Sequence, residues 1–137
     1  MPLTFVDANV LISASRGEAP AAERALDILD DPSREFASSA FLCLEILPKP
    51  IYERRQPEVD FYEKFFDAVA HWAAPNPELV DAAFEVAKSH GLAAMDALHV
   101  AAAESLGVVE FVTGELSSKP MFRVTSMRMR SIQSDLP

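Results

Sequence analysis

The first residues of the chain limit its fold more than any other stretch. Residues 3–6 (LTFV) are apolar and β-prone, which predicts a buried strand, and residues 8–12 (ANVLI) are apolar at a spacing that suits a helix. Asp7 stands between the two. At that junction a carboxylate lies at the C-terminal edge of a sheet, where open α/β folds place their chemistry. Asp7 could also serve only as the helix N-cap, because aspartate is a preferred cap.

The rest of the chain alternates between β-prone runs and helical patterns. Further helices are predicted at residues 19–29, 40–47, 51–55, 58–72, 77–90 and 93–106. Further strands are predicted at residues 35–38, 72–74 and 108–113, with an edge strand in the weakly alternating stretch 122–129. Such alternation is typical of parallel sheets with right-handed crossovers. We therefore expect an α/β fold: one domain, residues 1–137, built as a three-layer α/β/α sandwich around a central parallel sheet.

Local signals predict several helix ends. Ser39 is placed to cap the helix that follows it, Pro77 suits the first turn of the next long helix, and Gly91 can close that helix. Pro48 and Pro50 are expected to break or kink the helix that begins at residue 40.

Composition narrows the class of protein. No apolar run is long enough to cross a bilayer, and the first residues lack the basic segment of a signal peptide, so we expect a cytosolic protein with no membrane partner. The single cysteine, Cys43, lies in an apolar run, which predicts a buried thiol. The net charge of −9 argues against broad attraction to nucleic acid.

The charge is nevertheless unevenly distributed. Residues 58–85 carry seven acidic side chains and one lysine, whereas residues 119–130 carry four bases and no acid. Each run could simply be a solvated face. The alternative is that basic residues steer RNA over an acidic body; the candidates are Lys119, Arg123, Arg128 and Arg130, with Arg54 and Arg55 as weaker ones.

Four carboxylates stand apart from the solvated acids. Asp7 follows the first strand, and Glu115 follows the strand at 108–113. Because parallel strands end on the same edge of a sheet, these two should lie close together. Glu45 interrupts an apolar helix, and Asp96 lies in the first turn of an alanine-rich one. Both helices must pack against that sheet.

Each of these acids also has a simpler explanation: Asp7 and Asp96 as caps, Glu45 facing outward, Glu115 as a loop acid. Together these explanations require four coincidences. Clustered carboxylates repel one another and raise their pKa values, and a divalent cation is one remedy. Oxygen ligands favour Mg²⁺ or Mn²⁺ over Zn²⁺, and no His and Cys set has zinc spacing. Such an ion can activate water and stabilise charge at a scissile phosphate.

His99 is a further candidate for acid–base chemistry. A lone histidine on a buried helix is more often a hydrogen-bonded core residue than a general base, and we expect that here. The sequence contains no Ser-His-Asp order, P-loop or G-x-G-x-x-G motif.

The segments DANVLI, LEIL and MDALHVAAAESLGVVEFVTGE, together with the chain length, resemble a PIN-domain ribonuclease of the VapC toxin type. The order and spacing of the motifs carry the resemblance. Three acids match the family pattern: Asp7, Glu45 and Asp96. Three polar residues match its supporting positions: Asn9, Ser39 and Thr113. The fourth acid departs, since the family usually has Asp where this chain has Glu115.

The resemblance implies a PIN-like fold and a magnesium-dependent (or manganese-dependent) endoribonuclease that cleaves single-stranded RNA. Asp7, Asp96 and Glu115 would then bind the metal, and Glu45 would bind it directly or hold its water. The resemblance also implies a homodimer and a cognate antitoxin. Because Glu115 replaces the usual aspartate, two questions stay open. The site could bind one metal or two, and the chain could be an active enzyme or a catalytically impaired module that binds RNA or protein. A receiver-type phosphoacceptor is a further rival, but it needs an aspartate after the third strand.

The predicted helix at 58–72 carries an unusual number of aromatic residues: Phe61, Tyr62, Phe65, Phe66 and Trp72. They could all belong to the core. They could instead form an apolar groove for an amphipathic antitoxin helix with basic residues, or a homodimer contact.

Overall fold

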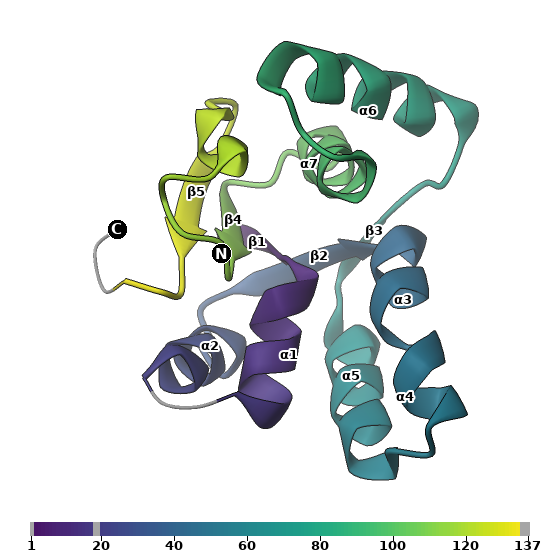
Figure 1. Cartoon of the computed structure of the whole chain (residues 1–137), viewed down its shortest axis with the longest axis vertical. Coiled ribbons are helices and arrows are strands. Elements are labelled where there is room, and N and C mark those ends of the chain that lie inside the picture. Colours follow the sequence, from purple (N-terminus) through teal and green to yellow (C-terminus); the bar gives the residue numbers. More distant parts are fainter. Residues whose placement is uncertain (1, 18–19, 135–137) are drawn as a thin grey trace.

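The computed structural model describes residues 2–17 and 20–134. Parallel strands form one sheet in the order β3-β2-β1-β4-β5 (Figure 1). Their bounds are β1 (Leu3–Val6), β2 (Glu35–Ser39), β3 (His71–Ala73), β4 (Glu110–Thr113) and β5 (Arg128–Ser131). The predicted parallel sheet, including an edge strand near the C-terminus, is confirmed.

Helices cover both faces of the sheet (Figure 1). One face carries α6 (Pro77–His90) and α7 (Ala94–Ser105). The helices that pack on the other face are α1 (Ala8–Arg16), α2 (Ala21–Leu29), α3 (Ala40–Ile46) and α5 (Gln56–Ala68), while the short α4 (Pro48–Tyr52) joins α3 to α5. A 3-10 turn, η1 (Pro120–Arg123), precedes β5. The chain therefore has the α/β/α layers expected from its sequence.

The central strands supply both cores because successive side chains point to opposite faces. Phe5 and Phe111 stack at 5.2 Å between ring centroids on the α6–α7 side. Their neighbours Val6 and Val112 are fully buried on the other side. Burial on both faces explains why each of these strands carries two consecutive apolar residues at the centre of the sheet, Phe5-Val6 in β1 and Phe111-Val112 in β4. Both strands end on the same edge, which positions the candidate site.

Several helix ends match the prediction. α6 spans Pro77–His90, with Asn76 as its N-cap and Gly91 in the left-handed region at φ 68°. Pro48 does end α3, but α4 begins at Pro48 itself because proline is tolerated in the first turn of a helix. The predicted helix 51–55 therefore begins too late and extends too far. Ser39 occupies the N-cap position of α3 without donating or accepting a capping hydrogen bond through its side chain.

Two further boundaries were wrong. The helix predicted at 58–72 ends at Ala68, because the chain turns extended at Val69 and His71–Ala73 pair with β2. In the predicted edge strand, only the last part is extended; Phe122 lies in η1. The prediction for 19–29 begins at a residue outside the described ones, and the helix is observed from Ala21.

Three aromatic residues of α5 belong to the core: Tyr62, Phe65 and Phe66. Tyr62 is fully buried, and Phe65 and Phe66 are each 8% exposed. Phe65 packs edge-on against Phe36 of β2 at 5.6 Å between ring centroids. For these three side chains the alternative that they belong to the core is confirmed, and the partner surface was wrong. Phe61 is only partly buried and Trp72 is 45% exposed, so a partner contact at these two stays a prediction. Other large apolar side chains are also exposed, among them Phe84 on α6.

Two further expectations concern the burial of Cys43 and membrane-spanning helices. Cys43 is only partly buried, and that burial raises the pKa of its thiol. None of the described helices is long and apolar enough to cross a membrane.

Candidate active site

Asp7 is held at the junction between β1 and α1. Its Oδ1 accepts a hydrogen bond from the Ala8 amide at 2.8 Å, and its Oδ2 accepts one from the Thr113 hydroxyl at 3.0 Å. The residue is 4% exposed. Burial raises the pKa of Asp7 to about 6, and the charge of Asp96 adds to this effect. Asp7 is therefore a helix cap and also a buried carboxylate with an unfavourable charge.

The end of β4 is tied to the start of α1. The Gly114 amide donates to Asn9 Oδ1 at 2.6 Å, and the Glu115 amide donates to Thr113 Oγ1 at 3.1 Å. A Cβ at Gly114 would lie 2.7 Å from Asn9 Cγ, so only glycine allows this approach. Asn9 and Thr113 thus fix the positions of the backbones that carry Asp7 and Glu115.

Glu45 reaches the site from α3. Its side chain is 36% exposed, but Oε1 lies 2.6 Å from Nε2 of the buried His99. One ligand atom each of Asp7, Glu45 and His99 lie within 4.8 Å of one another. The expectation that His99 is a hydrogen-bonded core residue is confirmed. Its partner is one of the four candidate acids, and nothing in the sequence indicated this pairing.

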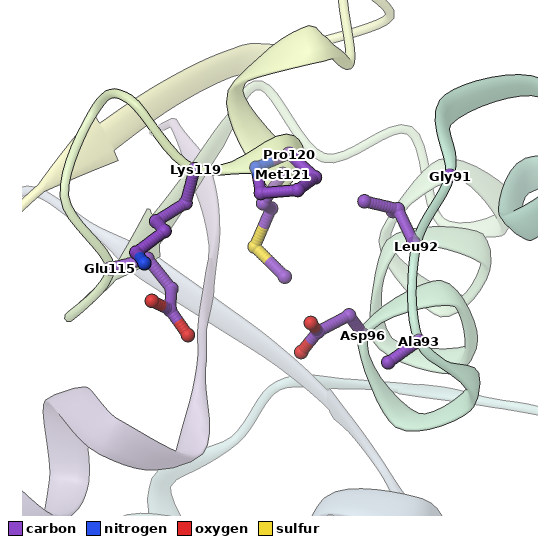
Figure 2. A pocket seen from close by; sticks show the side chains of 8 residues that line it. All are labelled: Gly91, Leu92, Ala93, Asp96, Glu115, Lys119, Pro120 and Met121. Atoms are coloured by element: carbon purple, nitrogen blue, oxygen red, sulfur yellow. The ribbon is translucent and has the colours of Figure 1, made fainter.

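Asp96 and Glu115 line a cavity of about 330 Å³ together with Lys119 and Met121. Figure 2 shows the carboxylates of Asp96 and Glu115 facing this space from opposite sides. Burial raises the pKa of Asp96, and the charges of Glu115 and Glu45 raise it further. The four candidate acids therefore form one electrostatically linked group, although they come from four separate segments of the chain.

This group suits a divalent cation. Among the described residues, no lysine or arginine forms an ion pair with Asp7, Asp96 or Glu115, so no side chain of these two types offsets their negative charges. Buried, mutually repelling carboxylates become stable when a cation binds them. Carboxylate oxygens are the ligands that Mg²⁺ and Mn²⁺ prefer. The residues present fit the metal that the sequence suggested.

The candidate RNA-contact residues are dispersed. Lys119 lines the cavity. Arg123 donates to the His90 carbonyl at 2.9 Å. Arg128 lies 3.4 Å from Glu110 at the start of β5, on the sheet edge opposite Asp7, and Arg130 lines a separate cleft.

Two further candidates, Arg54 and Arg55, follow α4; Arg55 pairs with Glu53 at 3.0 Å and Arg54 has φ 56°. Of all the candidate basic residues, Lys119 is the one that lines the cavity.

Ser39 lies at the C-terminal end of β2. Its hydroxyl is buried and has no hydrogen-bond partner among the described residues, and the same holds for Ser38. β3 ends at Ala73 and is followed by Ala74 and Pro75. The acid that a receiver-type phosphoacceptor needs after its third strand is absent.

The comparison with family models finds one match: the model described as PIN domain matches residues 4–115. That span includes all four candidate acids. No curated protein matches the chain.

Solved structures share the fold across nearly the whole chain. VapBC2 from Rickettsia felis, bound to a DNA fragment from its promoter, has a TM-score of 0.70 at 12% identity and covers 94% of this chain and 98% of its own. DNA-bound VapBC from Salmonella typhimurium has a TM-score of 0.70 at 13% identity, covering 96% and 99%. FitAcB from Neisseria gonorrhoeae has a TM-score of 0.60 at 18% identity, covering 95% and 98%.

Proposed function

Because the chain belongs to the PIN domain family, we propose that it is a metal-dependent endoribonuclease that hydrolyses phosphodiesters of single-stranded RNA. PIN domains are generally nucleases. One observation carries the proposal: carboxylates from four separate segments converge at one edge of the sheet, and the most buried of them, Asp7, has a pKa raised to about 6. Without a cation, such a group only destabilises the fold.

Asp7, Asp96 and Glu115 are the residues that would hold Mg²⁺ or Mn²⁺, with Glu45 as a direct or water-mediated contact. A bound ion of this kind activates a water and offsets negative charge at the scissile phosphate. Glu115 replaces the usual aspartate, yet its carboxylate faces the same cavity as Asp96 (Figure 2). This placement supports an active enzyme over an impaired binding module.

The surrounding residues orient the Asp7 carboxylate and place a positive charge beside the cavity. Hydrogen bonds from Ala8 and Thr113 fix both oxygens of Asp7, so that the carboxylate needs little rearrangement when a cation binds. Lys119 lies beside the cavity, where its ammonium can attract a phosphate of the RNA. The remaining acidic surface disfavours nonspecific binding of nucleic acid.

The solved neighbours support a toxin role in a toxin–antitoxin system as part of this proposal. The VapBC proteins of Rickettsia felis and Salmonella typhimurium share the fold over almost all of both chains. We accordingly propose an antitoxin as partner and a homodimer as the assembled state. An antitoxin that places a basic side chain on Asp7 or Asp96 would compete with the metal for the same carboxylates.

Cleavage of cellular RNA by the purified protein tests this function. We expect cleavage with Mg²⁺ or Mn²⁺, none with EDTA, and products that carry a 5′-phosphate when their ends are mapped. Products with a cyclic phosphate, or cleavage that persists in EDTA, would contradict a metal-dependent mechanism. Binding of RNA without cleavage would support the impaired module instead.

A further inference from the structure

We propose that His99 is a positioning residue that holds the Glu45 carboxylate in the site by donating a hydrogen bond from Nε2. The inference rests on the proposed function for its catalytic consequence. The contact is short, at 2.6 Å, and joins two helices on opposite faces of the sheet that lie 54 residues apart in sequence. His99 is fully buried, whereas the Glu45 side chain is 36% exposed.

Glu45 needs such an anchor because its helix position does not confine it. It is an exposed residue in α3, next to Leu44, which is 66% exposed. A glutamate there has several rotamers open to water, and ordering it costs conformational entropy. Its carboxylate is also repelled by Asp96. The hydrogen bond to His99 opposes both effects and keeps Oε1 close to Asp7.

The hydrogen-bond network also assigns the proton of His99. Nδ1 is buried and has no partner among the described residues. A proton on Nδ1 would therefore be a buried donor without an acceptor, which is costly, whereas a proton on Nε2 is donated directly to Glu45. The favoured tautomer carries its proton on Nε2.

This tautomer has a consequence for the metal. A nitrogen that carries a proton cannot bind a cation, so in this tautomer Nε2, the nitrogen that faces Glu45, does not ligate the metal. His99 therefore orients Glu45 without competing with the cation.

Three variants separate positioning from ligation. His99→Leu removes the donor, His99→Asn shortens the side chain so that its amide cannot reach Glu45, and His99→Gln places an amide NH₂ near the position of Nε2. We measure Mn²⁺ affinity by calorimetry, RNA cleavage rate, and fold by circular dichroism. The expected result is a loss of about 10- to 100-fold in Mn²⁺ affinity or rate for Leu and Asn, with Gln close to the wild type.

A double-variant cycle with Glu45→Ala tests whether His99 acts through Glu45. If it does, His99→Leu adds no further loss in a chain that already lacks the Glu45 carboxylate. The matched control is His71→Leu, because His71 pairs with Glu35 at 3.2 Å in an exposed contact at the opposite sheet edge. This control should leave both measurements unchanged.

The outcomes are distinct. If His99→Gln loses affinity as His99→Leu does, His99 is a ligand and the proposal is overturned. The proposal is also overturned if the losses in the double variant are additive, or if folded His99→Leu keeps full affinity and rate. Absence of Mn²⁺ binding in the wild type would overturn it as well. If His99→Leu does not fold, the comparison of Asn with Gln decides. Wild-type protein that binds Mn²⁺ but cleaves no RNA refutes the proposed function, and the affinity measurements still decide the role of His99.

Discussion

The Asn9 side chain accepts a hydrogen bond from the backbone of Gly114 at 2.6 Å, which joins residues 105 positions apart. Asn9 follows Asp7 by two residues, and Gly114 directly precedes Glu115. The contact therefore sets the distance between two of the candidate metal-binding segments. It also explains why glycine is needed at 114, because any side chain there would meet Asn9.

Gly114→Ala should damage both stability and activity. The new Cβ would lie 2.7 Å from Asn9 Cγ, so either the strand end or the helix must move. We expect a loss of about 1–3 kcal/mol in the free energy of unfolding, measured by urea denaturation. The Asn9→Ala/Gly114→Ala double variant removes the two nearest contacts, Cγ and Oδ1, and leaves the Asn9 Cβ at 3.0 Å. Its loss of stability should therefore be smaller than the sum of the two single losses. Strictly additive losses would contradict the contact.

The stability of the metal-free protein should fall as the pH rises from about 4 to about 6. Asp7 has a pKa of about 6 in the fold against an ordinary value of 3.8, so the folded state binds the proton more tightly than the unfolded state. Raising the pH through this window removes that stabilisation, which amounts to about 3 kcal/mol. Urea denaturation in EDTA should show the decline, and Asp7→Asn should flatten it. An identical pH profile for Asp7→Asn would rule out this assignment.

Mn²⁺ should raise the thermal stability at neutral pH. A cation that binds only the folded state adds about 2.7 kcal/mol at about 100 times its dissociation constant. Differential scanning calorimetry with and without Mn²⁺ measures the shift. An unchanged melting temperature at saturating Mn²⁺ would argue against a clustered metal site.

The fold was largely predictable because β1, β4, α6 and α7 carry strong local signals. Apolar runs marked the buried strands, and the Pro77 to Gly91 pattern gave the observed bounds of α6. The predicted end of the helix at 58–72 was wrong because pairing of His71 with Ala37, a contact distant in sequence, overrides helical periodicity there. Boundaries set by such tertiary pairing have no local signature.

The candidate site was predictable in part. The reasoning from parallel strand ends placed Asp7 and Glu115 on one edge, where both are found. The hydrogen bond between Glu45 and His99 could not be predicted, because it depends on how α3 and α7 pack. The sequence left the aromatic residues of α5 undecided for the same reason: whether Tyr62 faces a groove or the core depends on which elements cover it.

Tyr62→Ser and Phe84→Ser should therefore behave differently. Tyr62 is fully buried and donates to Glu58 at 2.7 Å, so its loss should cost about 3–5 kcal/mol of unfolding free energy. Phe84 is 66% exposed, and its replacement should change stability by about 0.5 kcal/mol or less. Equal losses, measured by urea denaturation, would contradict the assignment of α5 to the core.

The most direct test of the central claim compares RNA cleavage by Asp96→Asn with that by Asp81→Asn. Asp96 lines the cavity with Glu115, whereas Asp81 is an exposed acid on α6. Burial and the neighbouring acids raise the pKa of Asp96, which means that its negative charge is unfavourable in the fold. Because Asp96→Asn removes this charge, the metal-free variant should be at least as stable as the wild type. Our account predicts no Mg²⁺-dependent cleavage by folded Asp96→Asn and full cleavage by Asp81→Asn. Equal activity of the two variants would show that the acids at this sheet edge do not form the catalytic site.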